Sequence, residues 1–171
     1  MLSTDLMTDA FGRVQEAVHA VLLGAGSDLL EFRADPEANT IAWLVWHLTR
    51  VQDDHVADLM GEPQLWTTAG WQKRFDLPFA VGATGYRQSA GEVAAVRAGS
   101  DLLRGYFDAV HERTIAYLGT LREDDFGRVV DTRWTPPVTV AVRLVSVIGD
   151  DLEHAGQAAF VRGLAQRAGL H

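Results

Sequence analysis

Cysteine is absent from this sequence, so no disulfide bond can staple the fold. None is needed, because a chain of 171 residues is long enough to bury about 70% of its unfolded surface in one domain. Long apolar runs are also absent, and none approaches the roughly 20 residues that a membrane-spanning helix requires. The first residues, Met1 to Asp5, lack the basic and apolar regions of a signal peptide. We therefore expect a single domain over residues 1–171, in the cytoplasm and without membrane association.

Basic residues are scarce relative to acidic ones, with 15 Lys and Arg against 23 Asp and Glu and a formal net charge of -8. A surface of this sign repels phosphate backbones, and no basic cluster in the sequence offsets the repulsion. Nucleic acid is therefore excluded as an expected partner.

Apolar residues recur at helical spacing in four segments, residues 4–23, 39–61, 100–121 and 138–164. Asn39 or Thr40 can cap the second helix, and Gly163 is expected to end the last. The start of the last segment alternates like a strand, but the segment is far longer than ordinary strands, and Pro136-Pro137 lies just upstream, as at a helix start. The pattern predicts an all-α fold, an up-and-down four-helix bundle, which can build metal sites from side chains on facing helices.

The connection between the second and third helices is long and partly irregular. Residues 62–90 show no sustained periodicity and are followed by a short helical piece at residues 92–97. Connections of this length inside a compact domain are usually functional or partly helical. Aromatic residues in the connection indicate a lid packed over a site: Trp66, Trp71, Phe75, Phe79 and Tyr86.

Three side chains with metal-binding chemistry are predicted to face the interior. Asp150 and His154 are four residues apart, so they share one face of the last helix. His47 lies on the apolar stripe of the second helix. Buried polar groups must be satisfied, and a divalent metal would satisfy all three. Two His and one carboxylate also leave positions open for water or substrate.

Several alternatives stay open within this group. Asp151 precedes His154 by three residues, so it could replace Asp150 as the ligand or orient the imidazole. A structural His–Asp ion pair without metal is the other interpretation. Asp54 follows His47 by seven residues and is a candidate base on the open side of the site, or a support for its ligands. His55 is about 12 Å along the helix from His47, too far to bind the same ion.

The run Asn39-Thr40-Ile41-Ala42-Trp43-Leu44-Val45-Trp46-His47-Leu48, together with Asp150 and His154-Ala155-Gly156-Gln157, resembles the DinB-like superfamily. More narrowly, the chain resembles its actinobacterial branch, which is related to mycothiol-dependent S-transferases and maleylpyruvate isomerases. The similarity extends over nearly the whole chain and includes Trp134-Thr135-Pro136-Pro137. Each motif is loose by itself, whereas their order and spacing together are fairly specific.

The resemblance implies a four-helix bundle with a divalent metal held by three side chains, often zinc or nickel. Relatives supply one His from the second helix and two from the last. His47 and His154 match this pattern, whereas Asp150 stands where many relatives carry His. The ligand count is kept and a negative charge is added, which makes zinc the first choice, with nickel, iron and manganese as alternatives.

The relatives are thiol S-transferases or isomerases that use low-molecular-weight thiols such as mycothiol or bacillithiol. The resemblance therefore implies a metal-dependent transferase that activates such a thiol as thiolate for attack on a small electrophile, in detoxification or stress. Arg143, on the metal face, is a candidate for binding a carboxylate or sugar-phosphate-like group, with Trp43 as a further contact for the thiol. A solvated surface arginine is the alternative for Arg143. Such relatives also imply a homodimer formed through an exposed apolar helix face.

Three other functions stay open at this point. A non-enzymatic stress-response protein could use the bundle to sequester a metal ion or an electrophile. An iron(II) oxygenase could use the set of two His and one carboxylate. A purely structural bundle would hold a His–Asp pair and no metal.

Overall fold

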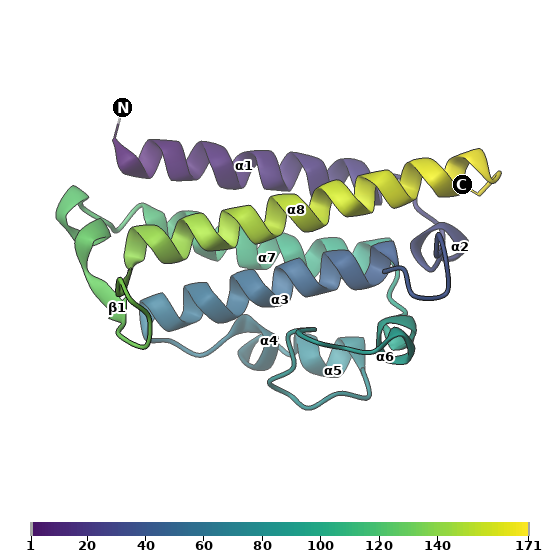
Figure 1. Ribbon diagram of the computed structural model, residues 1–171, viewed down its shortest axis with the longest axis horizontal. Helices are drawn as coiled ribbons and strands as arrows, with labels where there is room; N and C mark the ends of the chain where they lie inside the picture. Colours follow the sequence, from purple (N-terminus) through teal and green to yellow (C-terminus); the bar gives the residue numbers. More distant parts are fainter. Residues whose placement is uncertain (1, 171) are drawn as a thin grey trace.

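Four long helices form the body of the protein in a computed structural model that describes residues 2–170 (Figure 1). They are α1 (Ser3–Leu22), α3 (Ile41–Met60), α7 (Ser100–Leu118) and α8 (Val140–Arg167). Helices α1 and α3 each pack against both α7 and α8, which closes the ring of four. The predicted all-α four-helix bundle is therefore confirmed.

The helix directions do not simply alternate along the chain. One end of the bundle has its own hydrophobic cluster, which collects residues from the beginnings of α1 and α8 and from the ends of α3 and α7. Helices α3 and α7 therefore run in the same direction, opposite to α1 and α8, as Figure 1 shows. The order therefore differs from strict up-and-down alternation at one point: α3 and α7 are parallel, because the connection between them returns along the length of the bundle.

Helix α3 is the most deeply buried element. The Thr40 hydroxyl accepts a hydrogen bond from the Trp43 amide at 3.1 Å and caps its beginning. Gly61 ends it in the left-handed conformation, with φ of 67°. Because α7, α8 and the following connection surround α3, polar residues such as His47 and Arg50 are buried along with its apolar stripe. Both predicted limits of this helix are confirmed.

Helix α8 is longer than predicted. Its N-cap is Thr139, whose hydroxyl accepts from the Val142 amide. The expectation that Gly163 ends this helix is wrong, because the helix continues to Arg167. Ala165 is fully buried in the main core, and packing of this kind outweighs the roughly 1 kcal/mol that glycine costs inside a helix.

Strand-like alternation before α8 has a structural counterpart. Strand β1 (Val129–Asp131) pairs antiparallel with β2 (Val138–Thr139), so the first two residues of the predicted last helix belong to a strand. The sequence pattern did not predict this hairpin, nor the short helices α2 (Ser27–Leu30) and η1 (Glu123–Gly127). Helix α7 ends at Leu118, three residues before the predicted limit of 121.

The connection from α3 to α7 contains three short helices. These are α4 (Leu65–Thr68), α5 (Trp71–Phe75) and α6 (Ala90–Ala95). Trp66, Trp71 and Phe75 are buried in the main core cluster, where their rings pack around Tyr106 of α7. Three of the predicted lid aromatics therefore anchor the connection to the bundle, whereas Tyr86 is exposed.

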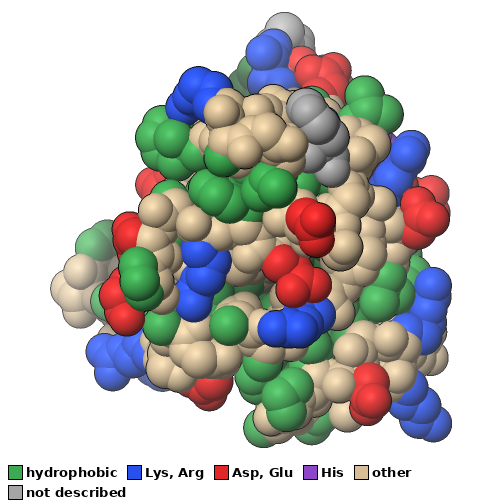
Figure 2. All heavy atoms as spheres, turned by 90° about the vertical axis from the view of Figure 1, so that its right-hand side faces the viewer, with side chains coloured by type: hydrophobic (Ala, Val, Ile, Leu, Met, Phe, Trp, Pro, Cys, Tyr) green, Lys and Arg blue, Asp and Glu red, His purple; other side chains and the backbone are tan. Residues whose placement is uncertain are grey.

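The surface near the C-terminal end of α8 mixes charged and apolar side chains. Figure 2 views this end of the bundle, where acidic and basic side chains are interspersed among apolar ones. Within residues 2–170, none of the helices combines the length and the apolar character needed to cross a membrane.

Candidate metal centre

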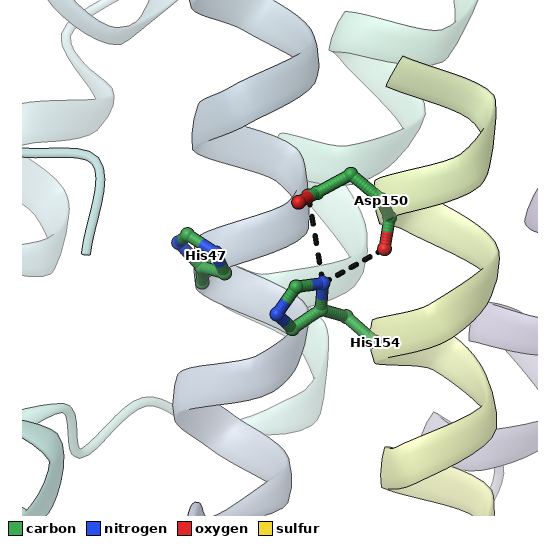
Figure 3. Close-up of side chains that lie close together, drawn as sticks. All are labelled: His47, Asp150 and His154. Carbon is green, nitrogen blue, oxygen red and sulfur yellow. Dashed lines mark hydrogen bonds and ion pairs between the residues drawn. The ribbon is translucent and has the colours of Figure 1, made fainter. Parts of the chain in front are cut away.

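His47, Asp150 and His154 meet between α3 and α8 (Figure 3). Each offers one ligand atom, and these atoms all lie within 4.8 Å of one another. The two imidazole ring centres are 4.6 Å apart. The convergence follows from local structure, because residues four apart on α8 share one face and that face packs on α3.

Both imidazoles are oriented by hydrogen bonds through the same ring atom. His154 Nδ1 lies 2.7 Å from the Asp150 backbone carbonyl, and His47 Nδ1 is hydrogen-bonded to the Thr84 carbonyl. A carbonyl oxygen only accepts, so each Nδ1 must be the donor. Each Nε2 is therefore the atom left for another partner. Metal-bound histidines commonly show this arrangement, with the second ring nitrogen donating to a backbone carbonyl or carboxylate.

The three groups differ in charge. Burial lowers the pKa of His47, and its hydrogen bond to the Thr84 carbonyl offsets only part of that effect. Burial also opposes charge on His154 and Asp150, but the attraction between the imidazolium and the carboxylate 3.5 Å away outweighs it, and His154 is helped further by its hydrogen bond to the Asp150 backbone carbonyl. As a result, the pKa of His154 is raised and that of Asp150 is lowered. Without a metal, the site favours a neutral His47 beside a protonated His154 paired with Asp150.

The donor set fits a divalent cation. Asp150 Oδ2 is buried and has no hydrogen-bond partner within residues 2–170, although it lies 3.5 Å from His154 Nδ1. An unsatisfied buried carboxylate oxygen costs free energy, and a cation beside it would remove that cost. Two imidazole nitrogens and one carboxylate oxygen suit zinc, iron and nickel, and they leave coordination positions open.

Asp151, the alternative ligand, lies elsewhere. Its side chain is fully buried, it is not a member of the three-residue group, and neither of its carboxylate oxygens has a hydrogen-bond partner in the described part of the chain. Burial, together with the neighbouring charge of Asp150, raises its pKa well above the usual value. The geometry therefore favours Asp150 as the carboxylate of the site.

Replacing Asp151 with asparagine is expected to stabilise the protein at neutral pH. The pKa of Asp151 is raised in the folded state above the unfolded value of about 3.9, so the folded chain binds more protons than the unfolded chain between these two values. The free energy of unfolding therefore falls as the pH rises above about 4, because Asp151 must ionise in a buried site. Asparagine cannot ionise and so removes that loss, and a gain of at least about 1.4 kcal/mol at pH 7, the equivalent of one pKa unit, is expected.

Denaturant unfolding of wild type and Asp151→Asn, both treated with a chelator, at pH 7 and pH 4 would measure this effect. The two proteins should differ at pH 7 and converge near pH 4. A variant that is less stable than wild type at pH 7 would contradict the account.

Trp43 forms one wall of the site. Its indole stacks on the His47 ring at 4.6 Å with 15° between the planes, and its ring centre is 6.3 Å from that of His154. Its Nε1 donates to Gln88 Oε1 at 2.7 Å. Trp43 therefore lies beside two of the three groups, and its contact with a thiol stays a prediction.

Arg143 lies about 10 Å along α8 from Asp150, at 1.5 Å per residue. Its side chain is 12% exposed, which differs from a freely solvated surface arginine. Nη1 lies 3.0 Å from His55 Nδ1 and 3.5 Å from an Asp58 oxygen, and Nη2 lies 3.5 Å from an Asp131 oxygen. Two carboxylates already neighbour this guanidinium, and its binding of an anionic substrate group stays a prediction.

Asp54 is not a member of the three-residue group and lies about 10 Å along α3 from His47. Its Oδ1 accepts from Gln64 Nε2 at 2.5 Å, and its Oδ2 lies 4.0 Å from His55 Nδ1. It lines a cavity of about 420 Å³ together with Asp58, Gly82 and other residues. Its role as a base stays a prediction.

Two further features beside the site were not predicted from the sequence. Thr84 and Gly85, in the α3–α7 connection, contact His47. The Thr84 backbone carbonyl accepts a hydrogen bond from its ring, and the Gly85 backbone lies close to that ring. No sequence motif marks either contact. Asp53 and Arg50 form a buried charged pair beside the site. The one available signal was the unfavourable placement of Asp53 in the C-terminal half of its helix.

Comparison with known proteins adds a family and a fold. A sequence model of the family described as mycothiol-S-transferase matches residues 6–166, which include His47, Asp150 and His154. A crystal structure described as the conserved protein of locus from Enterococcus faecalis is 31% identical with a TM-score of 0.88, over 95% of this chain and 96% of that chain. No curated protein sequence matches. The similarity therefore covers the whole bundle as well as the site.

Proposed function

This chain belongs to the mycothiol-S-transferase family, and from that premise we propose that it is a divalent-metal-dependent transferase of a low-molecular-weight thiol. One observation carries the metal dependence. His47 and His154 both donate through Nδ1 to backbone carbonyls, and each offers a ligand atom within 4.8 Å of one from Asp150, whose buried Oδ2 has no hydrogen-bond partner within residues 2–170. Zinc is the proposed ion, and nickel, iron and manganese are the alternatives that the same ligands accept.

Each of the three side chains has a separate task. His47 is neutral because burial lowers its pKa, so its Nε2 lone pair is available. The raised pKa of His154 means that protons compete with a metal ion for its imidazole more strongly than for an ordinary histidine. Asp150 contributes negative charge, which compensates part of the charge of a divalent ion. A metal bound by these groups would lower the pKa of an incoming thiol, so that the thiol reacts as thiolate near neutral pH.

The proposed reaction is a substitution at an electrophilic carbon. A carbon–sulfur bond forms from the thiolate, and the leaving group departs with the electrons of its former bond to carbon. The thiol proton passes to solvent or to a base, and Asp54 is the proposed base. Asp54 is about 10 Å along α3 from His47. Transfer of the thiol proton from the metal site to Asp54 therefore requires intervening water. The proposed substrate is a small electrophile, and the proposed role is detoxification.

Metal analysis and thiol turnover test this proposal together. Protein purified without chelator should contain about one divalent ion per chain, and it should consume mycothiol in the presence of a small fluorogenic electrophile. Chelation should abolish turnover, and the returned ion should restore it. Full turnover by metal-free protein would contradict the proposal, whereas bound metal without turnover of any thiol would favour a metal-binding stress-response protein.

We propose the cytoplasm as the location, because low-molecular-weight thiols are kept reduced there. A homodimer is the proposed assembly. An exposed stripe on α8 carries Val142, Val145 and Leu152, with Gly149 between Val145 and Leu152 and Gly156 one turn after Leu152. No atom lies within 4 Å of where a Cβ would stand at either glycine, so packing inside this chain does not explain them. Glycines on an exposed helix face permit close approach by a second helix.

A further inference from the structure

Segment 83–88, here called the strap, is tied to α3 by three side chains about one helical turn apart. Trp43 Nε1 donates to the Gln88 side chain at 2.7 Å. His47 Nδ1 donates to the Thr84 carbonyl, and Arg50 Nε donates to the Ala83 carbonyl at 3.1 Å. The middle one of these three side chains is the candidate metal ligand of α3. The path of the strap therefore determines which atom His47 presents to Asp150 and His154.

Gly85 allows the strap to come this close. A Cβ at Gly85 would lie 2.5 Å from His47 Nδ1 and 3.1 Å from Trp43 Cζ2. Real Cβ atoms are not found at the first of these distances, and the atoms in the way belong to two stacked rings that cannot easily move apart. Gly85 also has φ of 104°, a conformation that favours glycine. The next residues turn sharply, since the Gln88 amide donates to the Gly85 carbonyl at 3.2 Å.

We propose that Gly85 is a positioning residue for the metal centre, because its lack of a side chain lets the Thr84 carbonyl hold His47 Nδ1 and so presents Nε2 to the ion. The effect on metal binding rests on the proposed function, whereas the effect on the imidazole tautomer applies to the metal-free protein. A side chain at Gly85 displaces the imidazole or the Thr84 carbonyl. In either case the donor bond of Nδ1 is lost, and Nε2 is no longer fixed toward Asp150 and His154.

The anchors on either side of Gly85 make the expected effect local. Arg50 is fully buried and also donates from Nη1 to the Tyr106 hydroxyl at 3.2 Å, so the beginning of the strap is held independently of His47. Ser89, which follows the strap, caps α6 in a reciprocal arrangement with Glu92. A change at Gly85 therefore acts on the stretch between these anchors, where it meets His47 and Trp43.

The test compares Gly85→Ala with wild type in two measurements. Imidazole ¹⁵N chemical shifts in chelator-treated protein report the His47 tautomer, and titration against a competing chelator reports the zinc dissociation constant. Wild type should have the proton of His47 on Nδ1. Gly85→Ala should lose this preference and bind zinc about 10–100-fold more weakly, the usual effect of removing a partner that orients a ligand.

Two variants serve as matched controls. Gly70 lies in the same connection with φ of 74° and no atom within 4 Å of a Cβ, so Gly70→Ala reproduces the backbone strain without touching His47. Gly82→Ala adds a methyl group just before the strap, where nothing lies within 4 Å. Gly70→Ala is expected to lower the melting temperature while keeping the wild-type tautomer and zinc affinity. Gly82→Ala is expected to change none of these quantities.

Opposite results would overturn the proposal. Unchanged tautomer and affinity in Gly85→Ala would show that the strap does not orient His47, and an equal loss of affinity in Gly70→Ala would show that backbone strain alone is responsible. If Gly85→Ala does not fold, the wild-type tautomer still decides, because a proton on Nε2 contradicts the geometry. A wild type with the Nδ1 proton but without any zinc affinity would refute the metal function and leave the positioning of His47 intact.

Discussion

Replacing His154 with alanine is expected to reduce the affinity for zinc by more than about 100-fold and to abolish metal-dependent thiol transfer. Loss of a partner that merely orients a ligand costs 10–100-fold, and this substitution removes a ligand nitrogen itself. It also removes the ion-pair partner of Asp150, 3.5 Å away. The carboxylate would then be partly buried without a compensating charge. Titration with a competing chelator measures the affinity, and far-UV circular dichroism shows whether the helices are retained.

His19→Ala provides the control for this experiment. His19 Nε2 lies 2.6 Å from Asp108 Oδ1, so α1 and α7 also share a His–Asp pair, well outside the three-residue group. Its removal should leave zinc affinity unchanged. If His154→Ala and wild type bind zinc equally, or if both histidine variants lose only stability, then the pair formed by His154 and Asp150 is structural and the metal centre does not exist.

The composition of the three-residue group could be predicted because periodicity determines it. The spacing of Asp150 and His154 requires only that the segment be helical, and His47 sits on the apolar stripe of another helix. The spacing does not separate Asp150 from Asp151, since both precede His154 by about one turn. Thr84 and Gly85 could not be predicted, because a backbone carbonyl has no sequence signature and the path of an irregular connection depends on what it packs against.

Errors in the predicted elements have a common physical origin. Local rules favoured a stop at Gly163, yet α8 continues because Ala165 gains burial in the core. The aromatic residues of the α3–α7 connection were predicted to form a lid over a site, whereas Trp66, Trp71 and Phe75 are buried in the main core. Their position depends on Tyr106 of α7, because the rings of Trp66 and Trp71 pack around it. In both cases tertiary packing decided the outcome where local preference was weak.

The placement of Asp53 shows how a local conflict can mark a tertiary requirement. A carboxylate in the C-terminal half of a helix opposes the helix dipole. Asp53 is nevertheless 1% exposed, and it accepts hydrogen bonds from the first two backbone amides of α4 at 3.0 and 2.8 Å and from the Tyr106 hydroxyl at 2.8 Å. Arg50 and Arg113 lie 3.7 and 3.8 Å from its oxygens. The carboxylate thus joins α3, the beginning of α4 and α7.

Asp53→Ala is expected to destabilise the protein by about 3–5 kcal/mol, the usual cost of removing one partner of a buried charge pair. The fully buried Arg50 would lose its nearest carboxylate, and its Nη2 already lacks a hydrogen-bond partner within residues 2–170. Asp58→Ala is the control on the same helix. Asp58 is 65% exposed and pairs with Arg143 at 3.5 Å, so its loss should cost no more than about 1 kcal/mol. Denaturant unfolding of chelator-treated proteins gives both values.

Asp53→Asn separates the charge of this residue from its shape. Asparagine keeps one oxygen that can accept from the α4 amides, but it leaves Arg50 uncompensated. If charge dominates, Asp53→Asn should be nearly as unstable as Asp53→Ala, whereas hydrogen bonding to α4 predicts an intermediate loss, because asparagine keeps only one of the two oxygens that accept from the Leu65 and Trp66 amides. Because Arg50 also holds the Ala83 carbonyl of the strap, dominance of charge should in addition weaken zinc binding in both variants. A loss below about 1 kcal/mol in both would show that Arg50 reaches solvent, contrary to its observed burial.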